Sequence, residues 1–186
     1  MKNIVAFVGS RGLSPSFSPL VESVIQSVIS SDRFISVGCC TGLDAFVLGA
    51  APIDKVYCFS AFGEKEQGAC CFSATAHVKQ FYDRGGIVQY WSGGKGLLKK
   101  RLPNRTKAVI NSATISTVVF FGSPNSKGSA LACRLSIDRG LNVYAFACGF
   151  SGAELPIFNS GKWERVGSSG IWSESWRWKP SQVTVF

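Results

Sequence analysis

The sequence predicts an α/β protein with a Rossmann-like, doubly wound, mainly parallel sheet of about six strands, in a single domain with a short C-terminal extension. Short apolar runs alternate regularly with segments of helical periodicity, the pattern of repeated βα units. Several runs end in turns of glycine and serine. One run, Val118–Phe121, is wholly apolar, as expected of a parallel strand buried on both faces.

The stretch from 118 to 146 contains one complete βαβ unit. The strand Val118–Phe121 leads into a loop of small and polar residues at 122–129, and a helical pattern follows with Leu131 among its apolar positions. Gly140 closes that helix before a second buried strand at Asn142–Phe146. The loop is predicted past the carboxyl end of a strand and at a helix N-terminus, where free amides and the helix dipole favour an anion.

The other elements follow the same order. We expect strands at Asn3–Val8, Phe34–Val37, Lys55–Ser60, Ile87–Trp91 and Ile115–Phe121, and helices at Ser16–Ser30, Asp44–Ala51, Ala69–Arg84 and within Leu97–Ala113. Pro103 is expected to break the last of these, because proline lacks an amide donor and clashes with the preceding turn. A fresh helix would then begin at Asn104-Arg105.

We assign residues 1–149 to the Rossmann-like domain and residues 150–186 to a Trp-rich extension that packs on it. The tail of the extension holds three indoles, Trp172, Trp176 and Trp178, close to Arg177 and Lys179. Indoles beside cations can stack on nucleic-acid bases. They can equally cover the sheet edge or form a dimer contact.

Composition narrows the class of protein. Hydrophobic residues make up 46% of the chain and charged residues 17%, which is typical of a globular domain. No apolar run reaches the roughly 18 residues of a membrane helix, and the first apolar run ends at Gly9 with Arg11 after it. We therefore expect a cytoplasmic protein with no membrane partner. The net charge of +9 makes polyanions plausible partners.

Cysteine usage argues against a metal centre. The seven cysteines include two adjacent pairs, Cys39-Cys40 and Cys70-Cys71, but no CxxC pair, and His77 is the single histidine. A zinc site is not expected from this spacing. Reduced, mostly buried thiols in a reducing compartment fit better, and neither a metal nor a cofactor is predicted.

Two further turns resemble the loop at 122–129. Gly9-Ser10-Arg11 ends the first strand, where Arg11 can hold a phosphate through two donors. Gly38 and Gly42 flank the turn after the second strand, and Asp44 follows them. Asp44 is expected either to cap the following helix or to contact a ribose hydroxyl or base edge.

The ordered motifs resemble a known family. They are Val5-Ala6-Phe7-Val8-Gly9-Ser10-Arg11, Val37-Gly38 with Gly42-Leu43-Asp44, Asn104-Arg105 with Lys107-Ala108-Val109-Ile110, and Gly122-Ser123 with Gly128-Ser129. Together they resemble the Rossmann-like domain of the DNA-processing protein A (DprA/Smf) family, within the SLOG/LOG-like nucleotide-binding superfamily. The resemblance runs from about Asn3 to Ala147 and implies that these turns form one ligand site.

The sequence also departs from this family. Only Arg105 stands directly beside Asn104, where the family usually has two flanking arginines. The helical and winged-helix modules that flank many members are not found, so we expect a compact stand-alone version. In superfamily members that hydrolyse nucleoside monophosphates, a glutamate follows the glycine-rich loop. Here the matching segment is Gly128-Ser129-Ala130-Leu131-Ala132-Cys133, so the resemblance does not imply that activity.

The favoured function is therefore non-catalytic binding of a phosphate-bearing ligand. The residues expected to bind it are Gly9, Ser10, Arg11, Gly38, Thr41, Gly42, Asp44, Asn104, Arg105, Gly122, Ser123, Asn125, Ser126, Lys127, Gly128 and Ser129. The resemblance implies single-stranded nucleic acid as the ligand, and dimers are common in the family. The alternative is a small cyclic or ADP-ribose-like nucleotide signal that is sensed or sequestered, as by a phage counter-defence factor. Nucleotide hydrolysis through Glu64 or Asp44 is a third interpretation.

Overall fold

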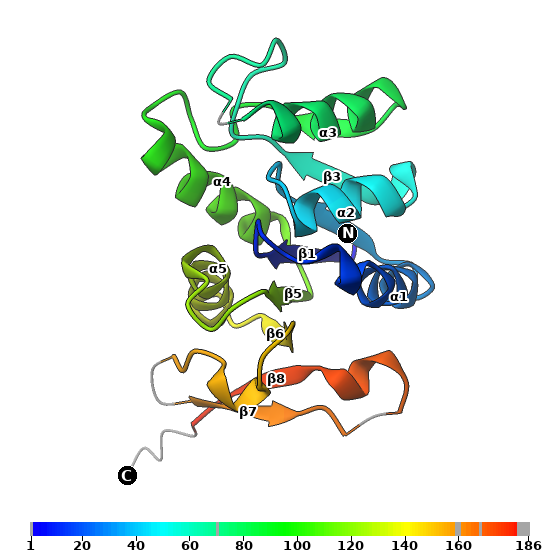
Figure 1. The fold of residues 1–186 in the computed structure, drawn as a ribbon, viewed down its shortest axis with the longest axis vertical. Coiled ribbons are helices and arrows are strands. Elements are labelled where there is room, and N and C mark those ends of the chain that lie inside the picture. Colours follow the sequence, from blue (N-terminus) through cyan, green and yellow to red (C-terminus); the bar gives the residue numbers. More distant parts are fainter. Residues whose placement is uncertain (1, 70, 159–160, 168, 182–186) are drawn as a thin grey trace.

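A single eight-stranded sheet organises the chain (Figure 1). The computed structural model describes residues 2–69, 71–158, 161–167 and 169–181. The strands are β1 (Ile4–Gly9), β2 (Phe34–Val37), β3 (Val56–Phe59), β4 (Ile87–Gln89), β5 (Ser116–Phe121), β6 (Asn142–Ala147), β7 (Gly161–Arg165) and β8 (Trp176–Pro180). The α-helices are α1 (Ser18–Ile29), α2 (Leu43–Ala50), α3 (Phe72–Asp83), α4 (Leu98–Ser112) and α5 (Lys127–Asp138). Short 3-10 turns cover 15–17, 53–55, 152–154 and 171–174.

The sheet has the strand order β4-β3-β2-β1-β5-β6-β8-β7. All pairs from β4 to β6 are parallel, which confirms the predicted Rossmann-like, mainly parallel sheet. The chain builds outward from β1 to β4 on one side, then returns to pair β5 with β1 and continues to β6 on the other. The strand order therefore reverses between β1 and β5. Doubly wound sheets bind ligands at the carboxyl ends of the strands beside such a reversal.

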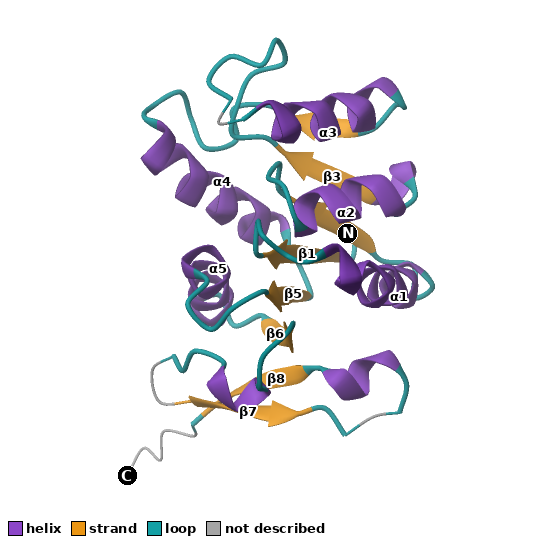
Figure 2. Ribbon diagram, viewed as in Figure 1, coloured by secondary structure: helices purple, strands orange, loops and turns teal. Residues whose placement is uncertain are grey.

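Helices cover both faces of the sheet, as Figure 2 shows. Helices α1, α2 and α3 lie on one face, and α4 and α5 lie on the other. Residues of β1 alternate accordingly: Val5 and Phe7 join the apolar cluster under the first three helices, whereas Ala6 and Val8 join the cluster under α4 and α5. All six residues of β5 are buried, as predicted for a central parallel strand.

The prediction that Pro103 breaks its helix is wrong. Helix α4 runs without interruption from Leu98 to Ser112 with Pro103 inside it. Pro103 falls six residues into the helix, where its missing donor deprives only the carbonyl of Lys99, and Lys99 is exposed to water. Tertiary contacts hold the two turns together, because Arg101 on one side of Pro103 and Arg105 on the other are both buried and both hydrogen-bonded.

The C-terminal region adds two strands that the sequence analysis did not identify as sheet. Strand β8 pairs antiparallel with β6, with Ala145 opposite Trp176, and β7 pairs antiparallel with β8. Trp178 is buried in a cluster with Phe121 of β5. The Trp172 indole lies on the α1 face, where its N–H donates to Ser27 at 2.8 Å. Trp172, Trp176 and Trp178 therefore pack against the apolar clusters of the sheet.

Some element boundaries differ from those expected. Helix α3 begins at Phe72 rather than Ala69, and β4 covers three residues instead of five. Cys70, which the sequence placed within this helix, lies outside the described part of the chain, as do the last five residues of the extension. Within the residues described, no helix combines the length and the apolar character that a bilayer span requires.

Candidate functional site

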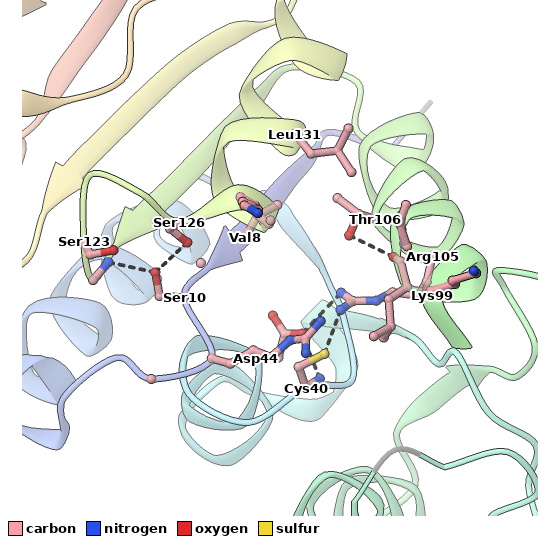
Figure 3. A pocket seen from close by; sticks show the side chains of 18 residues that line it. Val8, Ser10, Cys40, Asp44, Lys99, Arg105, Thr106, Ser123, Ser126 and Leu131 are labelled. Atoms are coloured by element: carbon pink, nitrogen blue, oxygen red, sulfur yellow. Dashed lines mark hydrogen bonds and ion pairs between the residues drawn. The ribbon is translucent and has the colours of Figure 1, made fainter. Parts of the chain in front are cut away.

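A pocket of about 640 Å³ lies at the carboxyl edge of the parallel sheet. It opens where β1 and β5 end, beside the N-termini of α2 and α5 and along one side of α4 (Figure 3). This is the place where the strand order reverses. The eighteen residues that line it are Val8, Gly9, Ser10, Arg11, Gly12, Cys40, Asp44, Lys99, Leu102, Pro103, Arg105, Thr106, Gly122, Ser123, Ser126, Lys127, Gly128 and Leu131.

Ser10 joins the first turn to the loop after β5. Its hydroxyl donates to Ser126 Oγ at 2.9 Å and accepts the Gly122 amide at 2.8 Å. The Ser126 hydroxyl is also 2.9 Å from that of Ser129, which is fully buried. Helix α5 starts one residue after Ser126, and the first amides of a helix have no partner within it. The serines therefore hold the N-terminus of α5 against the end of β1.

The turn after β2 is docked on the same segment through its backbone. Gly42 has a φ of +71°, and a Cβ there would lie 2.3 Å from the Ser10 carbonyl oxygen and 2.4 Å from that of Arg11. Glycine is therefore required both for the conformation and for the close approach. Thr41 Oγ1 also donates to the Arg11 carbonyl, at 3.3 Å. Two turns that are thirty residues apart in sequence are thus held in contact.

A buried ion pair forms the floor of the pocket. Arg105 reaches in from α4, and its Nη1 lies 3.2 Å from Oδ2 of Asp44, with both side chains less than a tenth exposed. The Asp44 oxygen also accepts the Cys40 amide at 2.9 Å. Nη2 of Arg105 donates to the Cys40 sulfur at 3.0 Å. Asp44 therefore ties the start of α2 to α4, and it is already engaged by two donors.

Gly38 makes room for this ion pair. A Cβ on Gly38 would stand 1.4 Å from Nη1 of Arg105 and 2.4 Å from the Asp44 carboxylate. Any side chain at this position would collide with the guanidinium, so glycine is required here for Arg105 to reach Asp44.

Burial and pairing act in opposite directions on the titration of these groups. Burial raises the pKa of the Asp44 carboxyl, against the Arg105 guanidinium and the Cys40 amide, which lower it. Burial lowers the pKa of Arg105, but the Asp44 carboxylate and the nearby thiols outweigh it and raise the pKa above its ordinary value. Arg105 is therefore a permanent buried cation.

Three further cations surround the opening. Arg11, Lys99 and Lys127 line the pocket and are exposed. Asp44 is the single carboxylate among the lining residues of the described chain, and Arg105 neutralises it. The pocket therefore carries an excess of positive charge, with exposed cations at its mouth and hydroxyls and helix amides within.

Ten of the sixteen residues expected to bind ligand line this pocket: Gly9, Ser10, Arg11, Asp44, Arg105, Gly122, Ser123, Ser126, Lys127 and Gly128. The other six are Gly38, Thr41, Gly42, Asn104, Asn125 and Ser129. Gly38, Thr41, Gly42 and Ser129 support the lining residues through the contacts above. Asn104 is directed elsewhere, because its amide donates to the Gly93 carbonyl at 3.4 Å. Asn125 is exposed on the loop.

The sequence analysis missed part of the lining. Lys99, Leu102 and Thr106 come from the same side of α4 as Arg105, and Cys40 belongs to the second turn. Helical spacing could have found the first group, since positions 99, 102 and 106 lie three and four residues apart. The expected break at Pro103 concealed this continuous face.

Neither Glu64 nor His77 lines the pocket. No group of three or more metal-ligating side chains of the kind His, Cys, Asp or Glu occurs among the residues that the structure describes. The chemistry that the pocket offers is therefore electrostatic and hydrogen-bonding: donors and cations arranged for a ligand rich in anionic oxygen.

Comparisons with known proteins agree with this fold. No family model and no curated protein sequence matches the chain. Among solved structures, DNA processing protein A (DprA) from Streptococcus pneumoniae superposes with a TM-score of 0.63 at 23% identity, covering 83% of this chain and 53% of that one. DprA from Helicobacter pylori, described with its single-stranded DNA binding mode, gives a TM-score of 0.62 at 16% identity, covering 78% and 65%. The chain thus has a DprA-like Rossmann fold and spans about half to two thirds of these proteins' length.

Proposed function

We propose that this protein binds single-stranded nucleic acid through its phosphates at the pocket between β1, β5 and α4. The observation that supports this most directly is the convergence of Arg11, Lys99 and Lys127 around the N-terminus of α5. Exposed cations and helix amides at one concave site suit a phosphate backbone. The DprA-like fold supports the same ligand class, because the H. pylori protein of this fold binds single-stranded DNA.

The three exposed cations have distinct roles in the proposed complex. Lys127 is the first residue of α5, so its charge adds to the positive end of that helix dipole. Lys99 lies across the pocket on α4, and Arg11 lies on the turn after β1. Charges on three different elements can contact successive phosphates of one strand. Each charge-assisted contact contributes about 1.5–3 kcal/mol, so three together reach the range of micromolar affinity, about 8 kcal/mol.

The buried ion pair is assigned a supporting role. Asp44 and Arg105 are each less than a tenth exposed and are paired with each other, so a ligand would have to displace one to bind the other. The pair holds α4 against the start of α2 beneath the phosphates, while the three exposed cations make the direct contacts.

A filter-binding titration with oligothymidylates of increasing length, at several salt concentrations, tests the proposal. Three neutralised phosphates predict that log K falls with log salt at a slope of about −2 for a single strand. Lys127→Ala should weaken binding and reduce the slope by about 0.7. The matched control is Lys162→Ala, because Lys162 lies on β7 and is absent from the pocket lining. Binding that ignores salt, or an equal loss in both variants, would refute the proposal.

A small nucleotide is the second candidate ligand, favoured by the pocket volume. A cavity of about 640 Å³ lies within the roughly 300–1,000 Å³ typical of small-molecule sites. For such a ligand, mononucleotides and cyclic dinucleotides would compete fully with the oligonucleotide, and affinity would not increase with strand length. Affinity that increases with length, together with weak competition by mononucleotides, would favour the polymer.

A further inference from the structure

One pocket residue has chemistry that phosphate binding does not use. Cys40 lines the pocket with its side chain beside Asp44 and Arg105, as Figure 3 shows. Its sulfur accepts a hydrogen bond from Nη2 of Arg105 at 3.0 Å. Its own amide is fixed by the Asp44 carboxylate at 2.9 Å. The sulfur is therefore held beside a buried cation, and Cys40, which is 4% exposed, forms part of the pocket wall.

The surroundings favour the thiolate over the thiol. Among the lining residues, Arg11, Lys99, Arg105 and Lys127 are cations and Asp44 is the one carboxylate, so a negative sulfur lies in an excess of positive charge. Cys40 also lies two residues before Gly42, the N-cap of α2, and helix N-termini stabilise thiolates. The guanidinium of Arg105 is also incompletely paired, because its buried Nε has no hydrogen-bond partner among the described residues.

The titration of Cys40 follows from this geometry. A hydrogen bond from the Cys39 side chain, assisted by Arg105 and Arg11 and opposed by burial and by the Asp44 carboxylate, lowers the pKa of the Cys40 thiol to about 6. Three other cysteines, all buried, respond in the opposite sense. The contact with Cys40 and burial raise the pKa of Cys39, and burial raises the pKa of Cys58 and of Cys133.

We propose that Cys40 is a covalent modification site, at which small uncharged electrophiles that carry a leaving group, hydrogen peroxide among them, react with the sulfur and obstruct the pocket. With hydrogen peroxide, the thiolate attacks one oxygen, an S–O bond forms, the O–O bond breaks and hydroxide leaves. The sulfur is oxidised to sulfenic acid and the peroxide is reduced. With iodoacetamide, an S–C bond forms, the C–I bond breaks and iodide leaves.

The obstruction follows from the position of the sulfur. An added group must occupy the pocket, because the opposite side of Cys40 is filled by the buried Asp44–Arg105 pair. Modification also removes the negative charge of the Cys40 thiolate, which Nη2 of Arg105 contacts. The effect on ligand binding rests on the proposed function, whereas the reactivity of the sulfur does not.

Alkylation by iodoacetamide between pH 5 and pH 9, with each cysteine quantified by peptide mass spectrometry, tests the reactivity. At pH 6 about half of the Cys40 thiol is ionised, against about 0.3% of an ordinary thiol with a pKa near 8.5. The rate of Cys40 alkylation should therefore reach half its maximum near pH 6, well below the midpoint for N-acetylcysteine, whose thiol has an ordinary, higher pKa.

Variants identify the cause of the shift. Cys39→Ala removes the neighbouring thiol, whose side chain contributes most to the lowered pKa of Cys40, and should move the half-maximal rate to higher pH. Cys133→Ala is the matched control, because Cys133 is buried in the separate cluster around Val119 and Phe121, and it should leave the profile unchanged. A Cys40 that stays unmodified, or whose rate rises with the same midpoint as that of N-acetylcysteine, overturns the proposal.

A second measurement separates this proposal from the proposed function. Protein alkylated at pH 6 until only Cys40 is modified should bind oligothymidylate at least tenfold more weakly than untreated protein. Equal binding by both would overturn the obstruction. Failure of untreated protein to bind would refute the proposed function alone, because the pH profile of alkylation would still decide whether Cys40 is the reactive site.

Discussion

The guanidinium of Arg105 passes over Gly38 so closely that a Cβ on Gly38 would lie 1.4 Å from Nη1. Gly38 follows β2 directly. Because it has no side chain, Arg105 of α4 can lie beneath the pocket. The resemblance of the motifs suggested a ligand role for both residues, but their contacts show that they act first on each other. The predictions below test this arrangement and the elements that support it.

Gly38→Ala should destabilise the protein by about 3 kcal/mol, because the new methyl group displaces a buried guanidinium from its carboxylate. Urea unfolding measures the change. The control is Gly49→Ala on the exposed side of α2, where an added Cβ meets nothing within 4 Å. That change should stabilise the protein by about 0.5–1 kcal/mol. Similar midpoints for the two variants would contradict the close contact.

Asp44→Asn should lower the free energy of unfolding by about 3–5 kcal/mol, because it leaves the Arg105 charge buried without its counterion. Asp83→Asn is the matched change at an exposed ion pair, with Lys79. It should have no measurable effect, since water and salt screen such pairs. Comparable losses in both variants would show that Arg105 does not depend on Asp44.

Pro103→Ala should keep helix α4 intact and raise the free energy of unfolding by about 1–3 kcal/mol, because the new amide can donate to the carbonyl of Lys99 and the ring is removed. Circular dichroism and urea unfolding measure both effects. Leu98→Ala, at the start of the same helix, controls for a general effect of shortening a side chain there. A loss of stability in Pro103→Ala would show that the ring makes a contact that the helix requires.

Trp178→Ala should destabilise the protein by about 3–5 kcal/mol, the usual cost of deleting a large buried aromatic side chain. Trp178 of β8 is 6% exposed and lies in the same buried cluster as Phe121 of β5. Amides of β7 and β8 should exchange faster in this variant. Ile157→Ala, at a side chain that is 72% exposed, should leave stability and exchange unchanged. Normal exchange in β7 and β8 of Trp178→Ala would show that this indole does not hold the strands.

The affinity for oligothymidylate should increase as the pH falls from 7 to 5. Hydrogen bonding from Cys39 and the neighbouring arginines keep the pKa of Cys40 near 6, so protonation in this range removes a negative charge from the pocket. Bound phosphate disfavours the thiolate, so binding and proton uptake reinforce each other. Cys40→Ser cannot ionise here and should flatten the dependence. A dependence as steep in that variant as in the unchanged protein would exclude Cys40 as the group responsible.

The predicted site depended on patterns that act locally. A wholly apolar run followed by glycine and serine specifies the end of a buried parallel strand, and parallel strands present their carboxyl ends at one edge of the sheet. The meeting of Ser10 with Ser126 was therefore predictable from the order of the elements. Nothing in a local pattern identifies the partner of Asn104, whose amide reaches the Gly93 carbonyl.

Long-range contacts explain the remaining differences. Local chemistry favours a break at Pro103, but two arginines on either side of it are anchored at distant places: Arg101 on the carbonyls of Ala61 and Gly68, and Arg105 on Asp44. In the C-terminal region, β8 forms because Trp176 and Trp178 cover the exposed edge and face of β6. Trp176 and Trp178 alternate over too few residues for the sequence to distinguish a strand from a loop.

The sequence by itself determined the parallel α/β architecture and the edge at which its turns converge, because hydrophobic periodicity and glycine positions act over a few residues. The tertiary structure alone decided which side chains meet at that edge. An aspartate and an arginine sixty-one residues apart neutralise each other there, and a thiol lies beside them. Burial sets that outcome, since a charge removed from water takes the nearest counterion, and only the folded chain establishes which group is nearest.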